Sequence, residues 1–228
     1  TELTNYIEFQ NEMNRLSKIK YHSYEKTMKE VGISYLGECN KSAKLTHNGK
    51  KNMLTYGIYL ASSDASNINV CPKSKMCRES CLVGSGYAKI DALAHNNKVL
   101  NARIIKTRLF FANRNLFMTL MIKEINRAIN KAKRLGMEFS VRLNCTSDIN
   151  PTVFMYEGKN ILQLYPNISF YDYTKVKSHW KVAEKYPNYY ITFSRDGSKE
   201  NEEECLEWLR RGNNVAVVFG VTKTSELP

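Results

Sequence analysis

The sequence lacks the features of a membrane, secreted or disordered protein. No apolar run approaches the ~20 residues of a transmembrane helix, and the amino-terminal stretch TELTNYIEFQNEMNRLSKIK is polar, without the apolar segment of a signal peptide. No Gly/Ser-rich, Pro-rich or low-complexity segment interrupts the chain. These absences predict a soluble, cytoplasmic protein and leave residues 1–228 as a single domain.

Several enzyme fingerprints are missing as well. The chain contains no P-loop and no dinucleotide-binding glycine motif, so ATP and NAD have no support as cofactors. It also has no G-x-S-x-G motif, which makes a serine nucleophile a poor prediction. Finally, no second pair of closely spaced cysteines is present to close a zinc site of two paired knuckles.

The composition is that of a basic globular protein. Of its 228 residues, 43% are apolar, which is enough for one sizeable core. With 34 Lys and Arg against 22 Asp and Glu, the formal net charge is +12, which attracts polyanions and makes a nucleotide or nucleic acid a plausible partner. The alternative is that the charge only keeps the protein soluble, because the basic residues do not form one tail or block.

The residue pattern predicts an α/β fold. Residues 1–50 are polar and Lys-rich, with weak helical periodicity, and form a helical N-terminal extension to a core of residues 51–228. In this core, predicted strands and helices alternate: strands 54–61, 138–144, 168–174, 189–195 and 214–220, and helices 88–112, 115–135, 175–185 and 201–211. Such alternation predicts parallel strands, and their number favours an open or partial β/α barrel.

Polar residues follow the predicted parallel strands at their carboxyl ends, where ligands bind in such sheets. Five of them are candidates for substrate binding: Arg142, Asn144, Asp148, Asp172 and Arg195. The alternative is that the two aspartates, like Ser147, only cap the helices that follow.

Three cysteines in the stretch CPKSKMCRESCL point to a metal. Cys71, Cys77 and Cys81 have the spacing C-x5-C-x3-C after the first core strand, and thiolates select zinc or iron–sulfur clusters. Three local thiols favour an open [4Fe-4S] cluster with one iron free for a ligand, while a zinc ion, or three free thiols without a metal, are the alternatives. Single candidates for a fourth ligand are Cys39, Cys145, Cys205 and the four histidines.

The place of this cysteine loop, after the first strand of a partial barrel, resembles that in radical S-adenosylmethionine enzymes. The spacing differs, because those enzymes usually have C-x3-C-x2-C, and no clear glycine-rich motif for the methionine carboxylate is present. The resemblance is one of layout. It implies S-adenosylmethionine as a second cofactor.

A second resemblance involves the order of several strings: GIYLASSDASNINVCPKSKMCRESCL, NARIIKTRLFFANRNLF, VRLNCTSDI, FYDYTK, YITFSRDG and NVAVVFG. Together they resemble the bacteriophage gene product 88-like family over about residues 50–220. The resemblance implies expression in the cytoplasm of an infected host bacterium, with the family's three cysteines at Cys71, Cys77 and Cys81. The family usually has Gly at the position of Cys145, which argues against that thiol as a fourth ligand. It also implies a further segment after SELP, so we expect a chain truncated at its carboxyl end.

The family's basic NARxxKT stretch lies on a predicted helix after the cysteine loop. Arg103 and Lys106 are one turn apart there, close enough to bind an anion near the metal. The alternative is a solvated helix face.

Two functions follow from these patterns. The first is a phage-encoded iron–sulfur protein with an open-site [4Fe-4S] cluster, a radical S-adenosylmethionine-like enzyme that acts on a nucleotide or nucleic acid. The second is a nucleic-acid-binding phage protein in which a cluster or a zinc ion is structural. A host protein as partner has no positive sign in the sequence.

Overall fold

The computed structural model describes residues 2–39, 52–74, 97–219 and 226. Two of the predicted metal ligands, Cys77 and Cys81, lie outside these residues, and so does the first part of the predicted helix 88–112. In the described part of the chain, no helix is long and apolar enough to cross a lipid bilayer.

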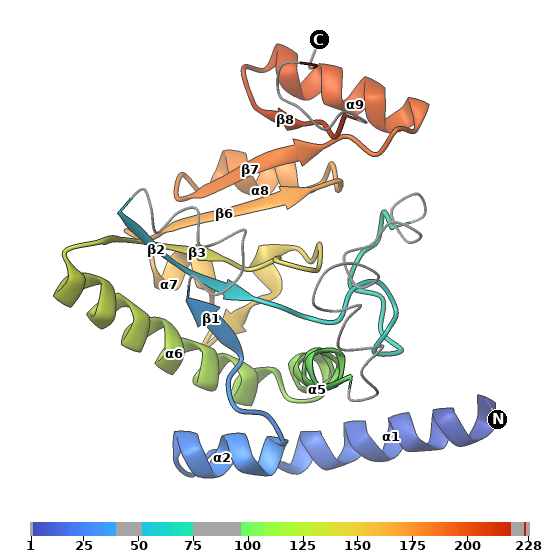
Figure 1. Cartoon of the computed structure of the whole chain (residues 1–228), viewed down its shortest axis with the longest axis vertical. Helices are drawn as coiled ribbons and strands as arrows, with labels where there is room; N and C mark the ends of the chain where they lie inside the picture. Colours follow the sequence, from blue (N-terminus) through green and yellow to red (C-terminus); the bar gives the residue numbers. More distant parts are fainter. Residues whose placement is uncertain (1, 40–51, 75–96, 220–225, 227–228) are drawn as a thin grey trace.

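A six-stranded sheet forms the centre of the fold (Figure 1). Its strands lie in the order β1-β2-β3-β6-β7-β8, with the bounds Gly37–Cys39, Met53–Ile58, Glu138–Arg142, Ser169–Thr174, Tyr189–Ser194 and Val215–Ala216. β1 is antiparallel to β2, and all other neighbours are parallel. The prediction of an α/β core with parallel strands is therefore confirmed.

The predicted barrel is not shown, because the sheet is open. Its two edges are β1 and β8, and these strands do not pair with each other. β1 runs against the direction of the core strands, and β8 pairs with β7 over only two residues, Val215 and Ala216. A barrel requires edge strands that meet, so the partial-barrel prediction was too specific.

Three helices pack on the same face of this sheet. They are α6 (Arg114–Leu135), α8 (His179–Lys185) and α9 (Lys199–Arg210). Tyr56 of β2 points to α6, where its hydroxyl donates to Glu124. Residues paired across strands share a face, and the pairs run from Tyr56 through Val141 and Phe170 to Tyr189.

Alternation along β7 puts Phe193 on the same face as Tyr189. Trp180 of α8 packs edge-on against Phe193 with ring centroids 5.2 Å apart. The same indole stacks on Trp208 of α9 with centroids 4.7 Å apart. The two tryptophans therefore fix α8 and α9 over the carboxyl-terminal half of the sheet.

The sequence dictates the long helix α6 plainly. Its apolar residues recur at three- and four-residue steps, and Phe117, Met121 and Ile125 are fully buried. Gly136 ends the helix in the left-handed conformation, with φ +63°. The preceding helix, α5 (Lys98–Ala112), meets α6 at Asn113, whose side chain caps α6 through the backbone N–H of Leu116.

In its described part, residues 2–39, the N-terminal extension is largely helical and is part of the packed core. It contains α1 (Glu2–Lys18) and α2 (Tyr24–Val31), which lie at the bottom of Figure 1. Leu16 and Leu36 are fully buried, and the side-chain amide of Asn113 donates to the carbonyls of Leu16 and Ile19 at 3.2 and 3.0 Å. The extension also supplies β1.

A small hairpin between β3 and β6 was absent from the sequence prediction. It follows a 3-10 turn, Pro151–Val153, and consists of β4 (Met155–Tyr156) and β5 (Lys159–Asn160), followed by the short helix α7 (Ile161–Leu164). Two-residue strands carry too little periodicity to be read from sequence.

Candidate functional site

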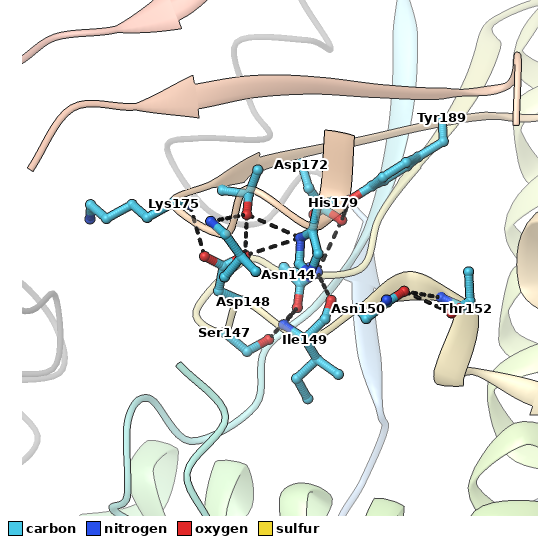
Figure 2. A network of polar contacts seen from close by, with 12 residues as sticks. Asn144, Ser147, Asp148, Ile149, Asn150, Thr152, Asp172, Lys175, His179 and Tyr189 are labelled. Carbon is cyan, nitrogen blue, oxygen red and sulfur yellow. Dashed lines mark hydrogen bonds and ion pairs between the residues drawn. The ribbon is translucent and has the colours of Figure 1, made fainter. Parts of the chain in front are cut away.

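The carboxyl ends of the parallel strands meet at one edge of the sheet, here called the rim. Arg142 ends β3, Asp172 lies in β6, and Asn144 and Asp148 follow β3 in the loop RLNCTSD. The structure brings these four predicted site residues together, and Figure 2 shows three of them, Asn144, Asp148 and Asp172. Asn144, Asp148 and Asp172 make hydrogen bonds within the protein, whereas the Arg142 side chain makes none with the described residues.

Asp172 fastens the loop that follows β3. It is 2% exposed, and its carboxylate accepts from the backbone N–H of Asn144 at 2.8 Å and from the side-chain amide at 3.1 Å. The hydroxyl of Tyr189 donates to the same carboxylate at 3.3 Å. Burial raises the pKa of Asp172 to about 7. Its partners make this carboxylate a structural anchor.

Asn144 in turn closes the loop on itself. Its side-chain oxygen accepts from the hydroxyl of Ser147 at 2.8 Å and from the backbone N–H of Ile149 at 2.9 Å, and its amide donates to the carbonyl of Ile149 at 2.9 Å. Asn144 is 2% exposed. Its side-chain hydrogen bonds are therefore used within the protein, although the residue lines the rim.

Asp148 ties the same loop to the end of β6. Its carboxylate accepts from the hydroxyl of Thr174 at 2.7 Å and from the backbone N–H of Lys175 at 2.9 Å, while Nδ1 of His179 lies 3.5 Å away (Figure 2). Burial raises the pKa of Asp148 and lowers that of His179. The Lys175 side chain points away from this network. Asp148 thus binds the start of the segment that leads into α8, but it is not the N-cap of α8, which is Ser178, or of the 3-10 turn that follows Asp148, which Asn150 caps.

The loop after β2 docks onto this same segment. The backbone N–H of Asp148 donates to the carbonyl of Val70 at 2.8 Å, and the hydroxyl of Thr146 donates to the carbonyl of Leu60 at 2.6 Å. These hydrogen bonds hold the loop after β2 against the RLNCTSD loop, so that Cys71 lies at the rim.

Cys71 is half-buried beside the RLNCTSD loop. Its sulfur accepts from the backbone N–H of Ser63 at 3.3 Å and lies 3.9 Å from the carbonyl oxygen of Thr146. A backbone N–H directed at sulfur stabilises a thiolate, which is the form that binds metals. The environment of Cys71 is compatible with a ligand.

A cavity of about 180 Å³ opens between these elements. We call it the rim pocket. Its lining residues are Ser62, Cys71, Lys73, Ser74, Arg142, Asn144, Cys145, Thr146, Ser147, Asp148, Tyr173, Thr174, Lys175 and Ser194. Hydroxyls and basic groups dominate this list, so the pocket suits a small polar ligand with negative charge.

Arg142 is the unusual member of the pocket. It is only 6% exposed, and its guanidinium makes no hydrogen bond within the described part of the chain, with Nε fully buried. Its charged carbon lies 4.8 Å from the ring centroid of Tyr173 and 5.8 Å from that of Tyr171. Cation–π contacts of this kind replace only part of the hydration that burial removes. The guanidinium has donors left for an anion.

Arg195, the fifth predicted substrate-binding residue, lies apart from the pocket. Its backbone N–H donates to the carbonyl of Ala216, and its guanidinium pairs with Glu202 of α9 at 3.3 Å. It is absent from the residues that line the rim pocket. Arg195 comes after β7, where the chain already turns toward α9.

The predicted anion-binding pair on α5 also lies outside the rim pocket. Lys106 is 4% exposed and its ammonium lies 4.5 Å from the ring centroid of Tyr35, while Arg103 lies over Tyr59 at 5.6 Å. Burial lowers the pKa of Lys106 to about 8. The alternative of a solvated helix face is wrong for Lys106.

The other described cysteines do not gather around Cys71 as a metal site. Cys39 is on β1 and Cys205 is buried on α9, and only Cys145 shares the rim pocket. No group of three His, Cys, Asp or Glu side chains that could hold a metal occurs among residues 2–39, 52–74, 97–219 and 226. A metal at Cys71 therefore requires ligands from outside these ranges, and Cys77 and Cys81 are the candidates from the sequence.

The family can now be assigned, because the rim is built from the same strings that gave the resemblance. A family model described as Gene product 88 matches residues 34–227. The chain belongs to the Gene product 88 family. No curated protein and no solved structure matches it. The predicted link to the phage gene product 88-like family is thus confirmed.

The match covers every strand of the sheet and both loops of the rim, and it leaves out α1 and α2. Sequence reasoning missed Lys73, Ser62 and Ser74 as pocket residues of this Gene product 88 chain. A signal was available, since their loop follows a strand whose carboxyl end was already placed at the rim. Tyr173 was missed because aromatic residues in a strand usually belong to the core.

Proposed function

We propose that this protein is a phage iron–sulfur protein whose rim pocket binds an anionic ligand beside an open [4Fe-4S] cluster. Cys71, Cys77 and Cys81 would hold the cluster, and the protein would act on a nucleotide or nucleic acid as a radical S-adenosylmethionine-like enzyme. One observation carries the proposal: the buried guanidinium of Arg142, which has no hydrogen-bond partner among the described residues, lines the same pocket as Cys71.

The donor set at Cys71 supports a soft metal. The residues around its sulfur are neutral hydrogen-bonding groups, and the N–H of Ser63 at 3.3 Å is the kind of donor that tunes cluster thiolates. Together with Cys77 and Cys81, the sequence supplies three thiols here, one fewer than the four ligands of a closed tetrahedral zinc site. A cluster with one open iron fits three thiols better.

Arg142 supports the anionic ligand. A guanidinium removed from water and left without an acceptor raises the free energy of the folded state, and an anion that binds it removes that cost. A carboxylate or phosphate group accepts two parallel N–H bonds from such a fork. Both S-adenosylmethionine and nucleotides carry one of these groups.

The chain's own residues have distinct tasks in this proposal. Arg142 binds the anionic group, and the hydroxyls of Ser62, Ser74 and Ser147 offer further hydrogen bonds from the pocket wall. Asp172 and Asp148 hold the RLNCTSD loop in place through their hydrogen bonds and do not contact the ligand. When bound, the cluster would supply an electron and an open iron for ligand binding.

The alternative is a nucleic-acid-binding protein in which the metal is structural. The net charge of +12 favours this function, because it does not depend on the pocket. The two functions differ in the metal and in the need for Arg142.

The test is metal analysis of protein purified without oxygen. We expect about four iron and four sulfide ions per chain in the parent protein and loss of both in Cys71→Ser and Cys77→Ser. Cys39→Ser is the matched control, since its thiol is also half-buried but lies on β1, away from the pocket. It should keep the full iron content.

Each other result has a defined meaning. One zinc ion per chain would replace the cluster with a structural metal and would favour the alternative function. No metal, or equal metal loss in Cys39→Ser and Cys71→Ser, would contradict the proposal. With the cluster present, Arg142→Met should keep iron and sulfide but lose binding of S-adenosylmethionine, measured by calorimetry.

A further inference from the structure

Among the described residues, no helix covers the second face of the sheet over β6 and β7. The described helices that pack against the sheet, α6, α8 and α9, all lie on the first face, with Phe193, Trp180 and Trp208 between them. Alternation along the two strands puts the remaining residues on the opposite side. Figure 1 shows α8 behind β6 and β7, with the strands in front of it.

Three tyrosines occupy this second side, which we call the tyrosine face. They are Tyr171 and Tyr173 of β6 and Tyr190 of β7. Tyr190 is 58% exposed and Tyr173 is 44% exposed. Tyr171 pairs directly with Tyr190 across the strands, and Tyr173 lies two residues further along β6. Strands lie about 4.8 Å apart and alternate residues about 6.6 Å apart, so the three rings form one continuous surface.

The tyrosine face runs into the rim pocket. Tyr173 of this face also lines that pocket. Arg142 lies over the rings of Tyr173 and Tyr171, at 4.8 and 5.8 Å from their centroids. Lys175 and Lys73 line the pocket at this end. The aromatic surface therefore ends in positive charge.

The basic side chains at this end differ in their partners. Lys73 pairs with Glu200 of α9 at 3.2 Å, whereas neither Arg142 nor Lys175 forms an ion pair with any described residue. A polyanion on the tyrosine face would therefore meet positive charge at the rim that no described carboxylate neutralises.

We infer that the tyrosine face binds a single-stranded nucleic acid, with bases stacked on Tyr190 and Tyr173 and a phosphate directed to Arg142. Exposed aromatic rings on a sheet are how several nucleic-acid-binding domains stack two or three bases. The inference deepens the proposed function, on which it rests for the pocket at the end of the strand. It names the substrate class: a strand whose end or target nucleotide reaches the rim pocket.

Charge complementarity favours a nucleic acid over a second copy of this chain. Two copies that met through this face would bring two sets of Arg142, Lys175 and Lys73 together in a protein with net charge +12, which is repulsive. A duplex is also disfavoured, because its bases are stacked on each other and cannot lie on tyrosine rings. An unpaired strand satisfies both the rings and the basic end.

The experiment uses the whole protein and a fluorescein-labelled oligodeoxythymidine of about 15 nucleotides, with binding followed by anisotropy. We expect Tyr190→Ala to weaken binding about 5- to 100-fold and Tyr190→Phe to keep it within about threefold, because the ring and not the hydroxyl stacks. Tyr6→Ala is the matched control: Tyr6 is also 58% exposed, but it lies on α1. It should bind like the parent.

Three outcomes would overturn the inference. They are no binding at low salt, equal affinity of Tyr190→Ala and the parent, and equal weakening in Tyr6→Ala. A fourth outcome would be a dimer of the parent protein that dissociates in Tyr190→Ala, measured by sedimentation. The tyrosine face would then be a dimer interface, and the inference would be wrong. A competing duplex of the same length should displace the oligonucleotide at least tenfold less well than the unlabelled strand.

One further variant separates this inference from the proposed function. Cys71→Ser removes a proposed metal ligand but no residue of the tyrosine face. Strand binding that persists in Cys71→Ser and is lost in Tyr190→Ala supports the inference even if no cluster is found. A cluster in a protein that shows no tyrosine effect supports the proposed function and removes only the inference.

Discussion

Glu124 and Arg142 are both charged and almost entirely buried, at 8% and 6% exposure, yet their surroundings are opposite. Glu124, on α6, accepts from the hydroxyls of Tyr24 and Tyr56 and from the backbone N–H groups of Leu36 and Gly37, the last two at 2.8 Å. We call these five residues the Glu124 cluster.

Arg142 has cation–π contacts but no hydrogen bond from the described residues. A buried charge with a structural role can thus be separated from one with a binding role by its hydrogen-bond partners. Glu124 joins α2, β1 and β2 to α6. Its carboxylate accepts four hydrogen bonds, all from groups of the protein itself. At the rim, Asp148 and Asp172 behave in the same way, whereas the buried guanidinium of Arg142 donates to none of the described residues. A perturbed buried acid is thus poor evidence for a ligand site here, whereas an unmatched buried base is good evidence.

The largest effect on stability is expected when the carboxylate of Glu124 is removed. Glu124→Ala leaves two hydroxyls and two backbone N–H groups without their acceptor, so we expect the free energy of unfolding to fall by about 3–5 kcal/mol. Urea unfolding followed by circular dichroism measures it. Glu8→Ala, an exposed glutamate on α1, is the control and should change it by less than about 0.5 kcal/mol. A loss of less than about 1 kcal/mol in Glu124→Ala would contradict the structural role.

The second prediction concerns pH and Asp172. Its pKa is about 7 in the folded protein, against a usual value of 3.8, because burial disfavours the charged form. The folded state therefore binds the proton more tightly, and the contribution of Asp172 to stability is present below pH 4 and is lost as pH rises toward 7. The loss amounts to at most about 4 kcal/mol.

Asp172→Asn should remove this slope. The difference in unfolding free energy between parent and variant, measured by urea titration at intervals from pH 4 to 8, should change most between pH 4 and 7. Glu8→Gln carries the same change of charge at an exposed site and should show no such trend. Parallel curves for parent and Asp172→Asn would show that this carboxyl titrates normally.

A third, smaller effect tests the other half of the comparison. Arg142→Met removes a buried charge that has no hydrogen bond, so we expect the unfolding free energy to stay within about 1 kcal/mol of the parent value or to rise. Pyrophosphate at ten times its Kd should stabilise the parent by about 1.4 kcal/mol and should not stabilise the variant. Thermal unfolding at constant ionic strength measures both.

Arg127→Met is the matched control for that measurement. Arg127 is an exposed arginine of α6 that lies over Tyr24 and pairs with Glu25 at 3.4 Å. Its variant should keep the full response to pyrophosphate. Equal stabilisation of Arg142→Met and the parent would mean that the anion binds elsewhere.

The smallest effect is expected at the edge of the pocket. Lys73 pairs with Glu200 of α9 at 3.2 Å, and both side chains are well exposed, at 45% and 76%. Glu200→Ala should change the unfolding free energy by less than about 0.5 kcal/mol. It frees the ammonium of Lys73, so pyrophosphate should bind slightly more tightly, and weaker binding would argue against a role of Lys73 in the pocket.

Local patterns in the sequence were sufficient to predict much of the fold. The helix over 115–135 and the parallel strands follow from periodicity, and the meeting of Arg142, Asn144, Asp148 and Asp172 at one rim follows from parallel strands alone. β1 could not be predicted, because its three residues pair with β2 only through tertiary contacts.

The roles of the rim residues were harder to predict than their location. Asp172 is used by Asn144, 28 residues earlier in the chain, and no local pattern reveals such a partner. Arg195 was grouped with them because it also follows a strand, but its side chain turns to Glu202. Which polar groups at a rim are already satisfied is a property of packing and not of sequence spacing.

The pairing of β2 with β3 has a consequence for folding kinetics. The hydroxyls of Thr55 and Ser140, 2.8 Å apart, belong to residues 85 positions apart in the chain, so these two neighbouring strands can pair only after a long stretch of chain has closed. Such non-local pairing slows folding. The cost of closure grows only with the logarithm of loop length, about 0.6 kcal/mol for each doubling. The distance in sequence between these two strands therefore affects the rate of folding more than the stability of the folded sheet.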